Sequence, residues 1–196
     1  MMGRNILIIQ GHPDKEQVHF GHALGQAYQE GADSAGFHTR QVTIATAEFP
    51  LLNTKFEFDH GQVPAAIKKA QDDILWADHI VIIYPLWLGA MPARLKGFFE
   101  QVFRPGFAMS EPESGHLWKK LLKGKSARII VTMGMPAFFY RWFFGGHSLK
   151  NLQRNILSFS GIKPIKATMI GMVDEGKEKE LKVWLSRVKL LGEKAI

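Results

Sequence analysis

The chain has 196 residues, a length typical of one domain. It contains no cysteine, which excludes disulfide scaffolds, thiolate metal sites, cysteine nucleophiles and dithiol redox chemistry. Any electron transfer must therefore run through a bound cofactor. The formal net charge of +7 indicates an anionic partner.

The sequence carries no signal for export or membrane insertion. No segment approaches the ~20 consecutive apolar residues of a membrane-spanning helix. Residues 1–5 lead directly into an apolar run and lack the apolar core and cleavage site of a signal peptide. We therefore expect a cytoplasmic protein that forms a single domain over residues 1–196.

Strand and helix patterns alternate along the chain. The expected elements, in chain order, are strand 5–10, helix 20–35, strand 39–44, helix 65–76, strand 79–84, helix 93–103, strand 128–133, helix 149–159, strand 165–170 and helix 177–191. The first, third and fourth strands are almost continuously apolar, as strands covered on both faces are. The second strand alternates, which favours a place nearer the edge of the sheet.

This alternation predicts an α/β fold, a doubly wound parallel sheet with helices on both faces. Five strands favour the flavodoxin-like order 2-1-3-4-5, in which the ligand lies beyond the carboxyl ends of the strands. Residues 104–124 are rich in Pro and Gly and too long for a plain connection. We interpret them as a loop excursion near the site or a partner.

The segment after the first strand, residues 11–19, contains His12 and His19 and leads into a helix at Phe20. A helix N-terminus is a natural seat for a phosphate, which the two histidines could share. The segment lacks the GxGxxG and GxxxxGK[ST] phosphate-binding motifs. It is therefore a candidate anion site of another kind.

The segments after the third and fourth strands are the other candidate parts of a site at the carboxyl ends of the strands. A turn after the third strand begins with Pro85, Leu86, Trp87 and Leu88. In this turn Trp87 could face a flat ring, although a lone Trp is more often part of the core. After the fourth strand, six of the seven residues 138–144 are aromatic. Such a run should line a pocket, a subunit interface or a membrane contact, the alternative being a buried cluster within one chain.

Three sequence blocks carry a resemblance to a known family: GHPD from residue 11, PLWLGAMPARLKGFFEQVFRPGFA from residue 85 and TMGMPAFFYRWFFGGH from residue 132. Together they resemble the flavodoxin-like NAD(P)H:quinone oxidoreductases, which include the DT-diaphorase-type quinone reductases and the modulator-of-drug-activity reductases. The similarity spans roughly residues 5–173.

The resemblance implies a homodimer that binds one flavin per site, takes a hydride from NAD(P)H and passes it to a quinone by a ping-pong mechanism. The implied flavin contacts are His12, His19, Phe20, Pro85, Leu86, Trp87, Leu88, Thr132, Met133, Gly134 and Met135. Tyr140 and His147 match the pair that stabilises charge during hydride transfer. Likeness to the diaphorase-type loops favours FAD over FMN. The two alternatives are azo- or nitro-compound reduction on the same flavin, and a non-catalytic regulatory subunit of a membrane transporter.

Positive charge is concentrated in one part of the chain. Residues 114–173 hold ten Lys or Arg and no Asp or Glu. This stretch is a solvated basic face, a site for the extra phosphate of NADPH, or a peripheral contact with an anionic membrane. Nucleic acid is disfavoured because no recognised module accompanies the charge. We expect no metal site, since His19 and His22 lack a third ligand at a recognisable spacing.

Overall fold

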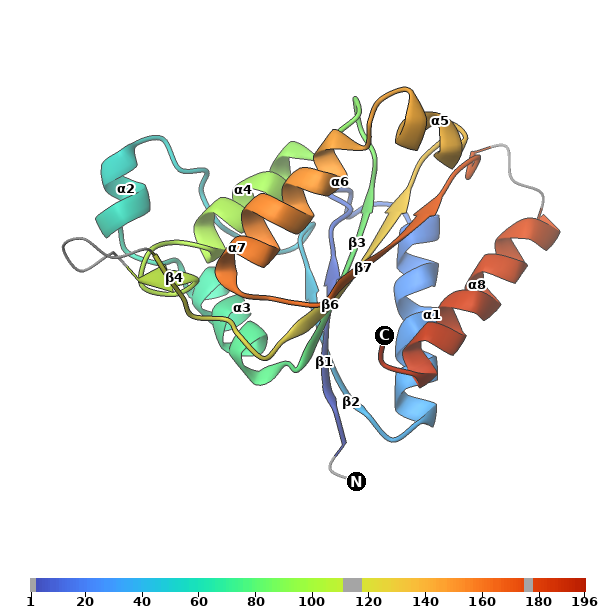
Figure 1. The fold of residues 1–196 in the computed structure, drawn as a ribbon, viewed down its shortest axis with the longest axis horizontal. Coiled ribbons are helices and arrows are strands. Elements are labelled where there is room, and N and C mark those ends of the chain that lie inside the picture. Colours follow the sequence, from blue (N-terminus) through green and yellow to red (C-terminus); the bar gives the residue numbers. More distant parts are fainter. Residues whose placement is uncertain (1–2, 111–117, 175–177) are drawn as a thin grey trace.

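The structure is a computed structural model that describes residues 3–110, 118–174 and 178–196. Five strands form one parallel sheet in the order β2-β1-β3-β6-β7 (Figure 1). These strands are β1 (Asn5–Gln10), β2 (His38–Thr43), β3 (His79–Pro85), β6 (Ser126–Thr132) and β7 (Ile165–Ile170). The predicted flavodoxin-like order 2-1-3-4-5 is confirmed, and the alternating strand lies at an edge.

Helices cover both faces of the sheet, as predicted (Figure 1). The larger helices are α1 (Phe20–Ser34), α3 (Ala65–Trp76), α4 (Ala93–Val102) and α8 (Glu178–Glu193). Because side chains of a strand alternate between its faces, β1 contributes to two cores. Leu7 and Ile9 pack in the core on the side of α3 and α4. Ile6 and Ile8 pack in the core on the side of α1 and α8.

Two glycines set the close approach of α1 and α8. A Cβ on Gly31 would lie 2.0 Å from the carbonyl oxygen of Lys189, and a Cβ on Gly192 would lie 2.0 Å from that of Tyr28. A methyl group at either position would push the helices apart. Gly31, in the last turn of α1, therefore serves packing between the two helices, despite its low helix propensity.

Several elements differ from the sequence-based expectation. The predicted helix 149–159 begins earlier, as α6 (His147–Asn151), and continues through the π-helical turn η1 (Leu152–Leu157) into α7 (Ser158–Ser160). Two short helices were not expected, α2 (Lys55–His60) and α5 (Ala137–Trp142). The aromatic run expected after the fourth strand lies largely on α5.

The excursion expected over residues 104–124 contains a small two-stranded sheet. Within it, β4 (Met109–Ser110) pairs antiparallel with β5 (Lys119–Lys120). Residues 111–117 of the excursion lie outside the described residues. In the part of the chain that the structure describes, no helix is long and apolar enough to cross a membrane.

Candidate functional site

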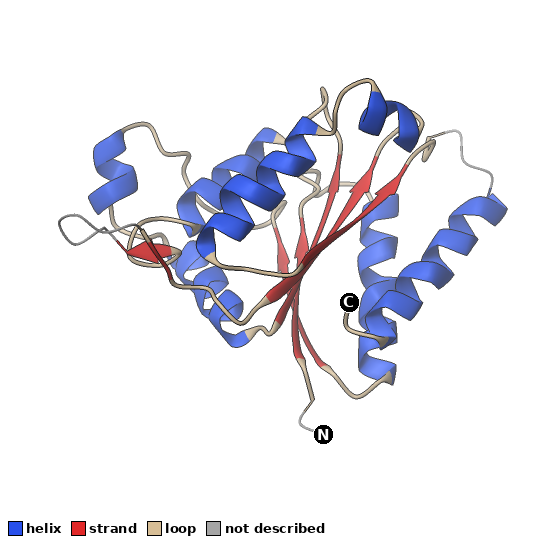
Figure 2. Cartoon of the chain, in the orientation of Figure 1, coloured by secondary structure: helices blue, strands red, loops and turns tan. Residues whose placement is uncertain are grey.

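The carboxyl ends of β1, β3 and β6 point to one edge of the sheet, where the loops that follow them meet (Figure 2). Backbone hydrogen bonds fasten these loops to neighbouring strand ends. The Gly11 N–H donates to the Ile83 carbonyl at 2.7 Å, and the Leu86 N–H donates to the Thr132 carbonyl at 2.7 Å. The sequence-predicted residues of the three segments are thus brought to the same edge.

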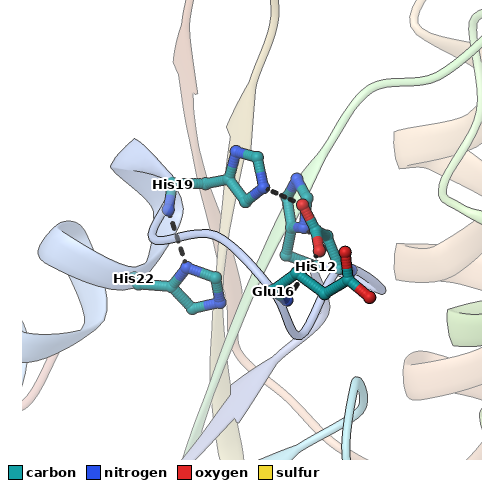
Figure 3. A network of polar contacts seen from close by, with 5 residues as sticks. His12, Glu16, His19 and His22 are labelled. Atoms are coloured by element: carbon teal, nitrogen blue, oxygen red, sulfur yellow. Dashed lines mark hydrogen bonds and ion pairs between the residues drawn. The ribbon is translucent and has the colours of Figure 1, made fainter.

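Three histidines and an aspartate form a polar network in the loop after β1 (Figure 3). The His19 Nε2 lies 2.7 Å from a carboxylate oxygen of Asp14. The Asp14 N–H donates to Nδ1 of His12 at 3.2 Å, and the His19 N–H donates to Nδ1 of His22 at 3.0 Å. Side chains therefore hold the loop in shape at the start of α1.

Burial and hydrogen bonding shift the pKa values of the groups in this network. Burial, together with the nearby imidazoles of His19 and His22, lowers the pKa of His12 to about 4. Burial likewise lowers the pKa of His22. Hydrogen bonding to His19 lowers the pKa of the Asp14 carboxyl. Near neutral pH His12 is uncharged, so an anion placed here would favour its protonation.

The loop after β3 is a tight turn. The Trp87 N–H donates to the Ala90 carbonyl at 2.8 Å, and the Ala90 N–H donates back to Trp87 at 2.9 Å. Both central residues have positive φ, 47° at Leu88 and 75° at Gly89. Since a leucine rarely adopts that conformation, the turn is held at some cost. It leaves the Trp87 side chain 48% exposed, with its ring at 85° to that of His12 and their centroids 5.7 Å apart.

The loop after β6 presents an open strand end. Thr132 and Met133 are buried, whereas Gly134 is exposed. A Cβ on Gly134 would lie 2.4 Å from a carboxylate oxygen of Asp174. The glycine therefore makes room for the carboxylate of Asp174 at this end of the sheet.

The remaining expected contacts are less exposed to solvent. Phe20 is partly buried and packs against the core under α1. Pro85, Leu86 and Met135 are also partly buried, and the last two pack against the other core.

The expected pair lies on the two helices that follow β6, with Tyr140 on α5 and His147 at the start of α6. Tyr140 is only 1% exposed, and its hydroxyl oxygen accepts a hydrogen bond from the Leu149 N–H at 3.3 Å. Burial raises the pKa of the Tyr140 hydroxyl, which therefore stays neutral. His147 is exposed, and no hydrogen bond joins it to Tyr140 in the structure. The structure thus places Tyr140 between α5 and α6, where it joins the two helices.

Sequence reasoning missed two acidic residues of the edge, Asp14 and Asp174. Asp14 stands two residues after His12 in the GHPD block, which is a local signal for a partner of the histidines. Asp174 follows β7, and only the fold brings it to Gly134. Among the described residues, no group of three or more His, Cys, Asp or Glu is placed to hold a metal ion.

The fold and this edge define a doubly wound α/β protein whose ligand site lies at the carboxyl ends of parallel strands. Residues 4–189 match the family described as "Flavodoxin-like fold". The chain is 32% identical over 222 residues to the ribosyldihydronicotinamide dehydrogenase (quinone) of Mus musculus, which covers 96% of this chain and 92% of that protein. It belongs to the flavodoxin-like NAD(P)H:quinone oxidoreductase family, as the three sequence blocks indicated.

Two further relatives illustrate the range of the similarity. The chain is 27% identical over 187 residues to the FMN-dependent NADH:quinone oxidoreductase of Nitratidesulfovibrio vulgaris, covering 84% of this chain and 85% of the relative. The solved NAD(P)H:quinone oxidoreductase of Methanothermobacter marburgensis superposes with a TM-score of 0.80 at 20% identity, covering 97% and 96% of the two chains. The latter similarity shows the shared fold.

Proposed function

We propose that this protein is a flavin-dependent oxidoreductase that moves a hydride from NAD(P)H to a quinone. One observation carries the proposal: the histidine network, the Trp87 turn and the open Gly134 strand end lie along one edge of a flavodoxin-like sheet. The names of the Mus musculus and Nitratidesulfovibrio vulgaris relatives support the same reaction.

The residues of this edge fit a flavin. The exposed loop residues 15–18 and the side chain of His19 stand at the N-terminus of α1, where an anionic phosphate is stabilised. The half-exposed indole of Trp87 offers a flat apolar surface to a ring. Gly134 is exposed and carries no side chain, so a ring can approach its backbone closely. When bound, the flavin supplies hydride transfer between the dinucleotide and the quinone.

The protein's own contribution is to position the reacting groups. Hydride transfer needs reacting atoms about 3–3.5 Å apart, so a rigid site matters more than acid–base groups. The Trp87–Ala90 turn, closed by two hydrogen bonds, fixes the indole. Backbone N–H groups at strand ends stabilise negative charge without rearrangement. In this proposal Tyr140 acts by holding α6, which begins at His147, against α5.

We propose FMN as the resident flavin, in place of the FAD that the loop likeness favoured. The support is the name of the Nitratidesulfovibrio vulgaris relative, which is FMN-dependent. An absorbance spectrum of the purified protein, with mass spectrometry of the released cofactor, tests this choice. Release of FAD would contradict it.

Turnover assays test the reaction itself. The purified protein, loaded with FMN, is given NADH or NADPH and then a benzoquinone or an azo dye as acceptor. We expect rapid quinone reduction and ping-pong kinetics. A colourless protein that stays inactive with added FMN and NADPH would instead favour the regulatory-subunit alternative. Faster reduction of the azo dye than of the quinone would favour the azoreductase alternative.

We further propose a cytoplasmic homodimer. An apolar cavity of about 190 Å³ between α4 and the η1–α7 helix supports an interface there, lined in part by Phe58, Phe99, Phe103 and Phe159. Sedimentation velocity tests the dimer, and Phe159→Glu is expected to give monomers. Fractionation of the source cells tests the location.

A further inference from the structure

The helix α5 carries an exposed aromatic surface. Phe138 is 68% exposed, Trp142 is 82% exposed and Phe143 is 72% exposed. The rings of Phe139 and Phe143 stack with centroids 4.9 Å apart, and Phe144 packs edge-on against both. We call Phe138, Phe139, Trp142, Phe143 and Phe144 the α5 patch. A contiguous aromatic surface of this kind marks an interaction site.

Cations border the α5 patch. Beside Trp142 lies a cavity of about 500 Å³, lined by Arg141 and Lys150 together with residues of α6, η1 and β7. None of its lining residues is acidic. The stretch 114–173, which contains the patch, holds ten Lys or Arg and no Asp or Glu. The apolar surface thus adjoins a hollow suited to an anionic group.

The α5 patch lies at the same edge of the fold as the candidate site. α5 follows β6 and stands at the end of the sheet toward which the strands point (Figure 1). Leu88, in the turn after β3 at this edge, is fully exposed. A flat surface in contact with the patch would therefore approach the opening of the site.

We propose that the α5 patch docks this protein on the surface of an anionic lipid bilayer. Aromatic side chains settle at the level of the headgroups, where their rings meet the acyl chains. Arg141 and Lys150 would face the phosphates of those headgroups, each strengthening the attraction. This docking does not depend on the proposed reaction.

The arrangement of charge favours a bilayer over a second copy of this chain or a soluble dinucleotide as the occupant of the α5 patch. In a two-fold contact between copies of this chain, each copy would bring Arg141 and Lys150 to the same contact, and the like charges would repel. A soluble dinucleotide phosphate could pair with the two cations but would leave Phe138 and Phe143 in water. A lipid surface offers phosphates to the two cations and an apolar layer to the rings.

Vesicle sedimentation of the full-length, flavin-loaded protein tests the proposal. The probes are vesicles of phosphatidylcholine alone and vesicles with added phosphatidylserine, each at low and high salt. We expect the protein to pellet with the anionic vesicles and to be released by salt. Arg141→Gln/Lys150→Gln is expected to weaken partition about twenty-fivefold, since each cation near an anionic surface contributes about fivefold.

Matched variants show whether vesicle binding depends on the α5 patch itself or on exposed cations and aromatic rings anywhere on the protein. Phe138→Ser/Trp142→Ser is expected to weaken partition about tenfold or more through lost apolar contact. Lys68→Gln/Lys182→Gln removes two cations elsewhere, and Phe56→Ser removes an exposed ring on α2; both should sediment like the wild type. All these residues are exposed, and thermal melts and flavin content confirm that the variants fold.

Three results would overturn the proposal. The wild type could stay in solution with anionic vesicles at low salt. The patch variants could partition as the wild type does. Finally, the wild type could be a dimer that does not bind vesicles, and the patch variants could be monomers in sedimentation velocity. That pair of results would assign the patch to self-association. Flavin content and quinone turnover are measured separately, so failure of docking is distinguishable from failure of the proposed reaction.

Discussion

The imidazole rings of His12 and His19 are stacked, with their centroids 3.7 Å apart and their planes 20° apart. His12 follows β1 and His19 precedes α1, so the stack closes the loop between them. Two charged imidazoles at this distance would repel each other. The low pKa of His12 fits a stack in which the His12 ring is uncharged near neutral pH, while the His19 ring is held by Asp14.

Replacing His19 with glutamine should weaken binding of FMN far more than binding of riboflavin, which lacks the phosphate. We expect about a tenfold loss for FMN, the typical contribution of one charge-assisted hydrogen bond, and less than about twofold for riboflavin. Fluorescence titration of the apoprotein measures both constants. His60→Gln, on the exposed end of α2, is the matched control. Equal losses for the two flavins would place the phosphate elsewhere.

Binding of FMN should be coupled to proton uptake. His12 has a pKa of about 4 and the pKa of His22 is also lowered, so both are largely neutral at pH 7. A phosphate dianion raises the pKa of neighbouring imidazoles, and protons therefore enter from solvent. Calorimetry at pH 7 in buffers of different ionisation enthalpy counts them. Binding that tightens from pH 8 to pH 6 is the expected companion result, and His12→Gln should reduce the uptake.

Acid should destabilise the protein through the buried His79. Burial, with Arg4, Arg128 and Lys166 nearby, lowers the pKa of His79 to about 3. In the unfolded chain a histidine titrates near about 6.5. Between these pH values the unfolded chain binds more protons than the folded protein. The contribution of His79 to the free energy of unfolding is therefore fully present above pH 6.5 and is lost as the pH drops toward 3.

This linkage predicts a slope of about 1.4 kcal/mol per pH unit from His79 within that window. Urea unfolding at pH 7, 6, 5 and 4 measures it, and His79→Gln should flatten the profile by that amount. A profile with the same slope in the variant would show that other groups carry the acid sensitivity.

Substituting Gly134 by alanine should cost flavin affinity with little cost in stability. The added Cβ would meet Asp174, whose exposed side chain can move aside. The methyl group would still occupy the strand end that the proposal gives to the flavin. We expect a loss of at least about tenfold in affinity and less than about 1 kcal/mol in stability.

The double variant Gly134→Ala/Asp174→Ala distinguishes the two sources of such a loss. If the methyl group itself blocks the flavin, affinity stays low when Asp174 is removed. Recovery to the wild-type value would trace the effect to the displaced carboxylate.

Tyr140→Phe should lower the free energy of unfolding by about 1–3 kcal/mol, because the buried Leu149 N–H loses its acceptor. Stopped-flow rates of flavin reduction and reoxidation should change little, since the Tyr140 hydroxyl is buried and bonded to the Leu149 N–H. A rate reduced more than about tenfold at unchanged stability would return Tyr140 to the charge-stabilising role that the resemblance implies. His147→Ala, at an exposed residue, is the comparison variant for both the stability and the rate measurements.

Much of the fold could be predicted because local patterns and burial agree. The apolar runs of β1, β3 and β6 predict central strands, and Gly36, with φ of 79°, ends α1 as its position after the helical pattern suggests. The short helices α2 and α5 could not be predicted. Six residues give too little periodicity to show a helical face. The aromatic run was expected to line a pocket, a subunit interface or a membrane contact, and α5 leaves most of its rings exposed.

The absence of cysteine and the three sequence blocks were enough to assign the family and to require a bound cofactor for redox chemistry. They also identified the strand-end segments, because a parallel sheet brings the carboxyl ends of its strands to one edge. Only the tertiary structure decided what each side chain does there. It stacked His12 on His19, set Asp174 beside Gly134 and buried Tyr140 against Leu149. Such contacts depend on how loops and helices from distant parts of the chain pack, and no local pattern encodes that packing.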